Sequence, residues 1–107
     1  MPDIAGCVSM DSKMAGDLIY AVGLTRNELG ASEYYEHLGY VGLNVPRVQP
    51  DAFAALYRAM GRVVAEGLAA SVHGVYRGGL GVHLALVAMG GGLGLHVDLR
   101  RVPAEAV

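Results

Sequence analysis

The chain has 107 residues, a net charge of −2, 53% hydrophobic residues and 17% charged residues. This length suits one domain and is too short for two, so residues 1–107 are predicted to form a single domain. With eight Lys and Arg in all and no basic tract, the sequence excludes a typical nucleic-acid binder. No apolar run reaches the roughly 18 residues of a membrane span, and the lone Cys7 has no internal disulfide partner. We therefore expect a cytoplasmic protein that contacts no membrane.

The low charge also bears on partners. An average soluble domain has about 25% charged residues, so this chain has unusually little charge to cover its surface. Extended apolar surface usually marks a contact. We expect a homo-oligomer, or other domains that cover this surface.

Four segments have the composition of strands. Residues 6–13 alternate polar and apolar side chains, and residues 18–22 form a short apolar run between glycines. Residues 71–76 and 93–99 resemble strands in the same way. Between the second and third strands, Ser32 precedes a predicted short helix that ends at Gly39, and residues 39–49 are predicted to be a loop.

Two longer helices are predicted. The first begins at Pro50, which is tolerated in a first turn, and ends near Gly67. Its apolar positions follow the spacing of one helical face: Phe53, Leu56, Tyr57, Met60, Val63, Val64 and Leu68. The second, residues 80–89, is apolar on every side except at His83, so it is expected to be buried.

The order of these elements predicts the fold class. Strands and helices in mixed order favour an α+β fold, an α/β sandwich with a roughly four-stranded mixed sheet and helices packed on it. The tail, residues 100–107, contains Pro103 and is expected to fray.

The four histidines do not predict a metal site. They lie on different predicted elements, 36, 10 and 13 residues apart, and zinc sites usually include a pair three or four residues apart. His83 is interpreted as a hydrogen-bonded or interface histidine.

Gly78 and Gly79 lie between a predicted strand and a predicted helix. Backbone N–H groups at a helix start can bind a phosphate, and glycine lets a ligand come close. A tight turn with no ligand explains the same glycines, and both interpretations stay open. The neighbouring Arg77 suits an anion, although surface arginines are common.

Five stretches occur in a characteristic order: residues 7–11, 17–34, 42–48, 67–82 and 91–99. Together they resemble the second AIR-synthetase-type C-terminal domain of the phosphoribosylformylglycinamidine synthase (formylglycinamide ribonucleotide amidotransferase) family. For example, residues 78–82 read GGLGV beside the family's G-G-L-A-V, and residues 91–99 read GGLGLHVDL beside G-G-L-G-A-x-I-D-L.

The resemblance implies a fold and an activity. Synthetases of this family are ligases of purine biosynthesis that convert formylglycinamide ribonucleotide, glutamine-derived ammonia and ATP into the amidine, with magnesium. Their catalytic and most of their metal-binding residues lie in N-terminal-type domains, which this chain lacks. The resemblance therefore implies a fragment that is inactive alone and has no cofactor of its own, while the complete enzyme uses ATP and Mg.

One stretch departs from the family pattern. Where the family has His-Asp-x-Ser-Glu-Gly-Gly, residues 73–79 read HGVYRGG, so two carboxylates are lost and Arg77 is gained. Oxygen ligands for Mg²⁺ are thereby removed. The ligand-binding positions that carry over are His73, Gly78 and Gly79, with Asn44 as a lesser candidate and Arg77 as a new cation; no catalytic or metal-binding residue is predicted.

Three functions follow as hypotheses. The first is a domain of the carbon–nitrogen ligase that frames a phosphate-bearing ligand. The second is a non-catalytic, self-associating interaction module. The third is an independent small-ligand or metal-binding protein.

Overall fold

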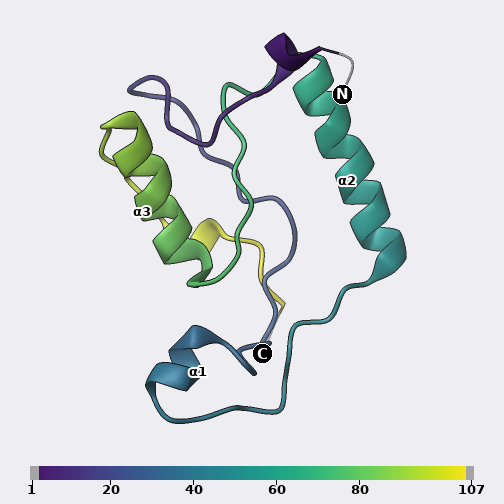
Figure 1. The fold of residues 1–107 in the computed structure, drawn as a ribbon, viewed down its shortest axis with the longest axis vertical. Coiled ribbons are helices and arrows are strands. Elements are labelled where there is room, and N and C mark those ends of the chain that lie inside the picture. The colour runs from purple at the N-terminus through teal and green to yellow at the C-terminus, as the bar shows by residue number, and fades with distance from the viewer. Residues whose placement is uncertain (1–2, 106–107) are drawn as a thin grey trace.

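The structure is a computed structural model that describes residues 3–105. Within this range it has three α-helices: α1 (Glu33–His37), α2 (Pro50–Ala65) and α3 (Gly79–Gly91). Two short 3₁₀ helices, η1 (Ile4–Gly6) and η2 (Leu99–Arg101), lie near the ends. Figure 1 shows α2 and α3 on opposite sides of the molecule, with extended segments between them and α1 at one end.

Local sequence explains the helix ends. The Ser32 hydroxyl caps α1 by accepting a hydrogen bond from the N–H of Tyr35 at 3.3 Å. Pro50 occupies the first turn of α2, where its missing N–H costs nothing. Gly92 ends α3 with a φ of 64°, a left-handed conformation that glycine adopts readily. The three helices predicted from the sequence are confirmed.

The predicted sheet is wrong. The described residues contain no strand, so the chain is not an α+β sandwich with a four-stranded sheet. The segments predicted as strands, residues 6–13, 18–22, 71–76 and 93–99, run without a ladder of hydrogen bonds.

Single backbone contacts replace that ladder. The N–H of Val72 donates to the carbonyl of Ser9 at 3.1 Å, which joins two of the predicted strands at one point. Thr25 forms an isolated parallel bridge with Ala104. Strand-type residues fit a pleated, paired surface but do not create the partner, and a sheet needs several successive pairings in register. Alternation in these segments was therefore not sufficient to predict a sheet.

The tail, predicted to fray, makes contacts as far as the structure describes it. Asp98 caps η2, and Glu105 forms an ion pair with Arg26 at 2.8 Å. Residues 106–107 lie outside the described residues.

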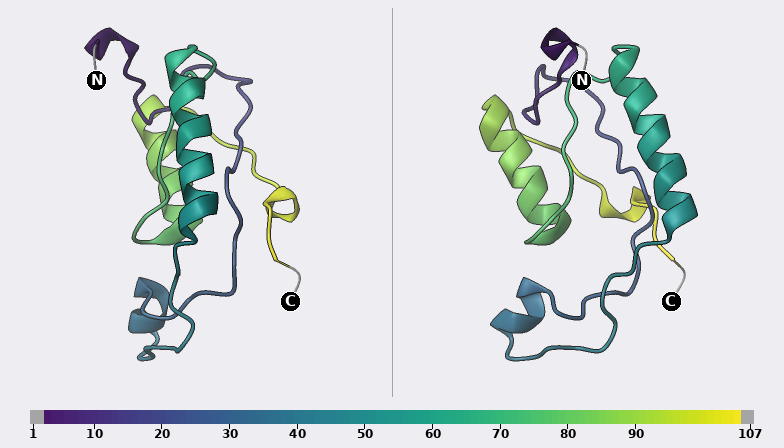
Figure 2. Two further views of the ribbon diagram at one scale, coloured as in Figure 1. Left: turned by 90° about the vertical axis from the view of Figure 1, so that its right-hand side faces the viewer. Right: turned by 45° about the vertical axis from the view of Figure 1, so that its right-hand side comes forward.

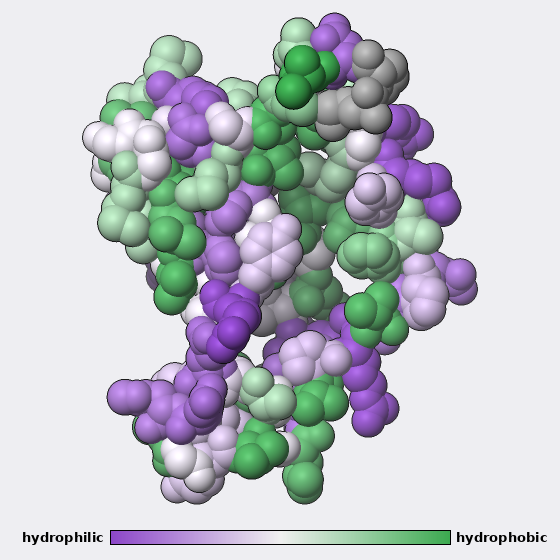
Figure 3. Space-filling model, in the orientation of Figure 1, coloured by the Kyte–Doolittle hydropathy of each residue, from purple (hydrophilic) through white to green (hydrophobic). Residues whose placement is uncertain are grey.

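The packing is open. No hydrophobic side chain among residues 3–105 is fully buried, and His83 is the buried polar side chain. The radius of gyration is 15.5 Å, beside about 13 Å for a compact domain of this length. The right-hand view of Figure 2 shows α2 and α3 apart, with extended segments between them. Figure 3 shows a hollow with hydrophobic residues on its right side and hydrophilic residues on its left. Within the described range, no helix is both long and apolar enough to span a membrane.

Candidate functional site

The residues that precede α3 fold back onto it around His83. The His83 side chain is 7% exposed, and its Nδ1 lies 2.8 Å from Nε2 of His73. On the other side of the ring, Nε2 accepts a hydrogen bond from the N–H of Tyr76 at 2.9 Å and lies 3.1 Å from the carbonyl oxygen of Arg77. One helical side chain therefore holds both ends of the 73–77 segment.

Nε2 of His83 lies between a backbone donor, the N–H of Tyr76, and a backbone acceptor, the carbonyl of Arg77. An unprotonated Nε2 accepts from Tyr76, whereas a protonated Nε2 donates to Arg77. In either tautomer both ring nitrogens of this buried side chain have a hydrogen-bond partner.

Tyr76 packs against both rings. Its ring meets His73 edge to face at 6.3 Å between centroids, and His83 at 5.6 Å. The hydroxyl end of Tyr76 lies where a Cβ of residue 74 would be, so Gly74 leaves room for the ring. Gly74 and Tyr76, two departures from the family pattern, are therefore coupled in space.

The glycine turn follows directly. Gly78 and Gly79 have φ values of 90° and 72°, which favour glycine. The N–H of Gly79 donates to the carbonyl of Tyr76 at 3.1 Å, so this amide is already used within the turn. Arg77 points away from the turn and forms an ion pair with Glu33 of α1 at 2.7 Å, with its side chain 83% exposed.

Asn44 lies elsewhere. It faces Gly30, whose N–H donates to the Asn44 carbonyl at 2.7 Å. It lines a depression of about 320 Å³ with none of the turn residues, beside Arg26, Asn27, Glu28, Val45, Arg47 and Glu105. The structure therefore brings His73 close to the turn at Gly78 and Gly79. It directs the Arg77 side chain to Glu33 and places Asn44 in a separate region.

The residues of the turn do not fit magnesium. Mg²⁺ is bound through carboxylate and other oxygens, and residues 73–79 contain no Asp or Glu. Across residues 3–105, no group of three or more His, Cys, Asp or Glu side chains is arranged to hold a metal ion.

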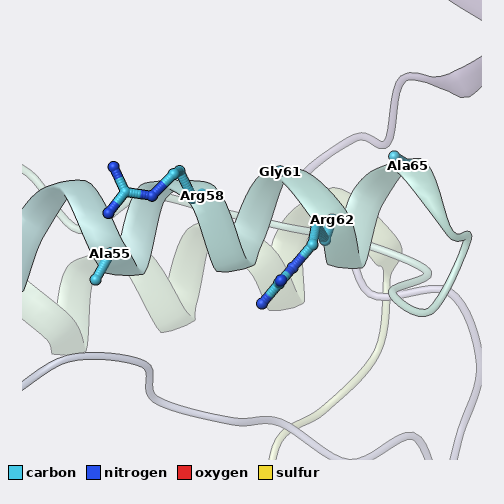
Figure 4. A pocket seen from close by; sticks show the side chains of 5 residues that line it. All are labelled: Ala55, Arg58, Gly61, Arg62 and Ala65. Atoms are coloured by element: carbon cyan, nitrogen blue, oxygen red, sulfur yellow. The ribbon is translucent and has the colours of Figure 1, made fainter.

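A second depression, of about 560 Å³, runs along the outer side of α2. Ala55, Arg58, Gly61, Arg62 and Ala65 line it. Figure 4 shows both arginine side chains on this surface with small residues between them. It is a shallow, open surface with no carboxylate, thiol or histidine among its lining residues, so it offers no acid–base chemistry.

Sequence reasoning missed the pairing of His73 with His83 and the position of Tyr76. The signal for His83 was present, since it is the lone polar side chain in an otherwise apolar helix. The interpretation of His83 as a hydrogen-bonded histidine is confirmed. Its partner was hidden, because ten residues separate the two histidines and a turn of unknown shape lies between them.

The family is shown by comparison with known proteins. The model of the family described as AIR synthase related protein, C-terminal domain, matches residues 14–106. The chain belongs to this family.

Its relatives are subunits of a purine-pathway synthase. Phosphoribosylformylglycinamidine synthase subunit PurL of Thermococcus gammatolerans is 43% identical over 90 residues, which are 84% of this chain and 13% of the relative. The same subunit of Thermococcus sibiricus is 38% identical over 97 residues, 91% of this chain and 14% of the relative. The same subunit of Moorella thermoacetica is 36% identical over 100 residues, which are 92% of this chain and 14% of the relative. The chain thus spans about a seventh of the length of these relatives. No solved structure matches the chain.

Proposed function

We propose that this chain acts as a C-terminal-type domain of a phosphoribosylformylglycinamidine synthase, the ligase that forms formylglycinamidine ribonucleotide. The observation that carries the proposal is the family match over residues 14–106, together with relatives of that name. The chain corresponds to 13–14% of each relative, so the ATP- and magnesium-dependent chemistry is assigned to the other domains of such an enzyme. Alone, the chain is expected to be inactive.

A chimera tests this function. In the Thermococcus gammatolerans subunit, the 90 matched residues are replaced by the corresponding residues of this chain, and amidine formation is measured. We expect activity within about tenfold of the parent, because a domain of this family should present the same contacts. A control chimera with a flexible linker of equal length should be inactive. A folded chimera as inactive as the linker control would contradict the proposal.

The local task proposed for the glycine turn is to frame a phosphate-bearing ligand. Arg77, beside two left-handed glycines at the start of α3, supports an anion there. Its ion pair with Glu33 has to open for the guanidinium to reach a ligand. Calorimetric titration of the chain with formylglycinamide ribonucleotide should show saturable binding that a Gly79→Leu substitution abolishes. The absence of saturable heat with the unaltered chain would refute this role.

A further inference from the structure

One hydrogen bond between two imidazole rings joins α3 to the 73–77 segment, which leads into the start of this helix (Figure 1). Nδ1 of His83 and Nε2 of His73 lie 2.8 Å apart. At that distance one of the two nitrogens has to donate a proton and the other has to accept it. The contact therefore depends on how many protons the two rings carry.

The number of protons sets a limit to this contact. Two neutral rings carry one N–H each, and a pair with one charged ring carries one N–H more. In both of these states a single N–H can lie between the rings. When both rings are charged, every ring nitrogen carries a proton, so two donors face each other and two positive charges meet. The hydrogen bond between His73 and His83 is thus compatible with one charge on the pair and not with two.

The position of His83 decides which part of the chain has to move. His83 lies in α3 and is 7% exposed, so its ring cannot turn into solvent while the 73–77 segment covers it. A charged His83 ring also cannot accept a hydrogen bond from the N–H of Tyr76. The Tyr76 ring packs on both imidazoles, at 6.3 Å from His73 and 5.6 Å from His83 between centroids. Separating two charged rings therefore moves His73 away from α3, and Tyr76 with it.

The groups around the pair offer no negative charge against this repulsion. From the 73–77 segment the pair meets the Tyr76 ring, which is uncharged in neutral or acidic solution, and the backbone carbonyl of Arg77. The Arg77 guanidinium points to Glu33 of α1 at 2.7 Å, so that carboxylate is already paired. Among residues 3–105, no Asp or Glu forms a hydrogen bond or an ion pair with either histidine.

From these observations we infer that His73 and His83 form a pH-sensitive latch, which holds the 73–77 segment on α3 at neutral pH and releases it when both rings are protonated. Imidazole takes up its proton near pH 6.5 in water, so release is expected in mildly acidic solution. Two released neutral rings can bind two further protons and the closed latch one, so the closed form becomes less stable as the pH falls. The inference does not rest on the proposed ligase function, because it concerns contacts within the chain.

NMR of the isotope-labelled 107-residue chain between about pH 8 and pH 4.5 tests the latch. Overhauser contacts between the rings of Tyr76 and His83 report the closed form, and the carbon-bound protons of each imidazole report its charge. We expect the contacts near pH 8 and their loss by about pH 5. Once both rings titrate, the ratio of closed to open form should fall by about tenfold per pH unit, because opening takes up one further proton.

A variant with one titrating ring separates the latch from other effects of acid. His73→Gln keeps a donor and an acceptor beside His83 but cannot become charged. A single charge on His83 is then tolerated, so the contact between Tyr76 and His83 should persist to about pH 5. His37→Gln removes an imidazole at an exposed position in α1, and this control should release the segment as the unaltered chain does.

A contact that survives while both imidazoles are charged would overturn the inference, as would one that is absent near pH 8 or lost while both rings are neutral. Equal release in the unaltered chain and in His73→Gln, with helix content intact in both, would also refute the latch. If acid unfolds the whole chain, His73→Gln should move the midpoint of unfolding to lower pH, and an unchanged midpoint counts against the latch. If the substitution itself unfolds the chain, the ring charges measured in the unaltered chain decide by the first criterion. The chimera experiment is unaffected by any of these results, so the two proposals fail separately.

Discussion

Replacing His83 by leucine tests the hydrogen-bonded histidine pair. His83→Leu places an apolar side chain of similar size in α3 and removes the ring nitrogens that lie 2.9 Å from the backbone nitrogen of Tyr76 and 2.8 Å from Nε2 of His73. Each lost hydrogen bond costs about 0.5–1.5 kcal/mol. Leucine favours a helix over histidine by up to about 0.5 kcal/mol. The net loss in the free energy of unfolding is therefore about 0.5–3 kcal/mol.

The assay is thermal unfolding followed by far-UV circular dichroism, since helices dominate the described structure. A loss of about 0.5–3 kcal/mol lowers Tm by roughly 2–24 °C for a domain of about this size. His37→Leu, at an exposed position in α1, is the matched control and should change the free energy of unfolding by less than about 0.5 kcal/mol. His83→Gln, which keeps one donor and one acceptor, should recover part of the loss. A leucine variant as stable as the unaltered chain would refute the role assigned to the histidine pair.

Three further predictions concern other parts of the chain. Hydrogen bonds from Lys13 and then Ser9 lower the pKa of the Asp11 carboxyl from 3.8 to about 2. The contribution of the Asp11 carboxylate to stability is therefore complete above pH 3.8 and is lost as the pH falls towards 2. Titration of Asp11 by NMR should show the lowered pKa, and Lys13→Met should return it towards 3.8. Gly74→Ala should displace the Tyr76 ring and lower the free energy of unfolding by about 1 kcal/mol. In a Tyr76→Ser background the same substitution should cost less. Additive effects of the two substitutions in a double-mutant cycle would exclude the coupling. A methyl group at position 61 of α2 would meet no other atom within 4 Å. Since alanine favours a helix over glycine, Gly61→Ala should raise the free energy of unfolding by about 0.5–1 kcal/mol. A lower free energy of unfolding in a urea titration would show that this side of α2 is not open.

The loss of carboxylates at the glycine turn gains a structural explanation. Tyr76 fills the space beside Gly74 and packs on the histidine pair, while Arg77 engages Glu33. The segment 73–77 is thus held by side-chain contacts of its own.

Sequence motifs located part of the candidate site. The glycine turn was visible as two glycines before an apolar helix, and His73 and Arg77 were assigned to it through their positions in the motif. Asn44 was grouped with them by resemblance alone, and the structure places it against Gly30. The number of residues between Asn44 and the turn does not predict how far apart they lie in space, because the loops between elements can place a residue at either end of a molecule.

The sequence by itself determined the three helices, their ends to within about two residues, and the family. Those features depend on local signals: the Ser32 cap, Pro50 in a first turn and Gly92 in a left-handed conformation. Only the tertiary structure decided that the alternating segments form no sheet, that ring nitrogens of His73 and His83 lie 2.8 Å apart, and that Phe53 and Tyr57 are exposed. Strand pairing and side-chain contacts of this kind join residues that are distant in the chain, and their free energy depends on partners that no local pattern specifies.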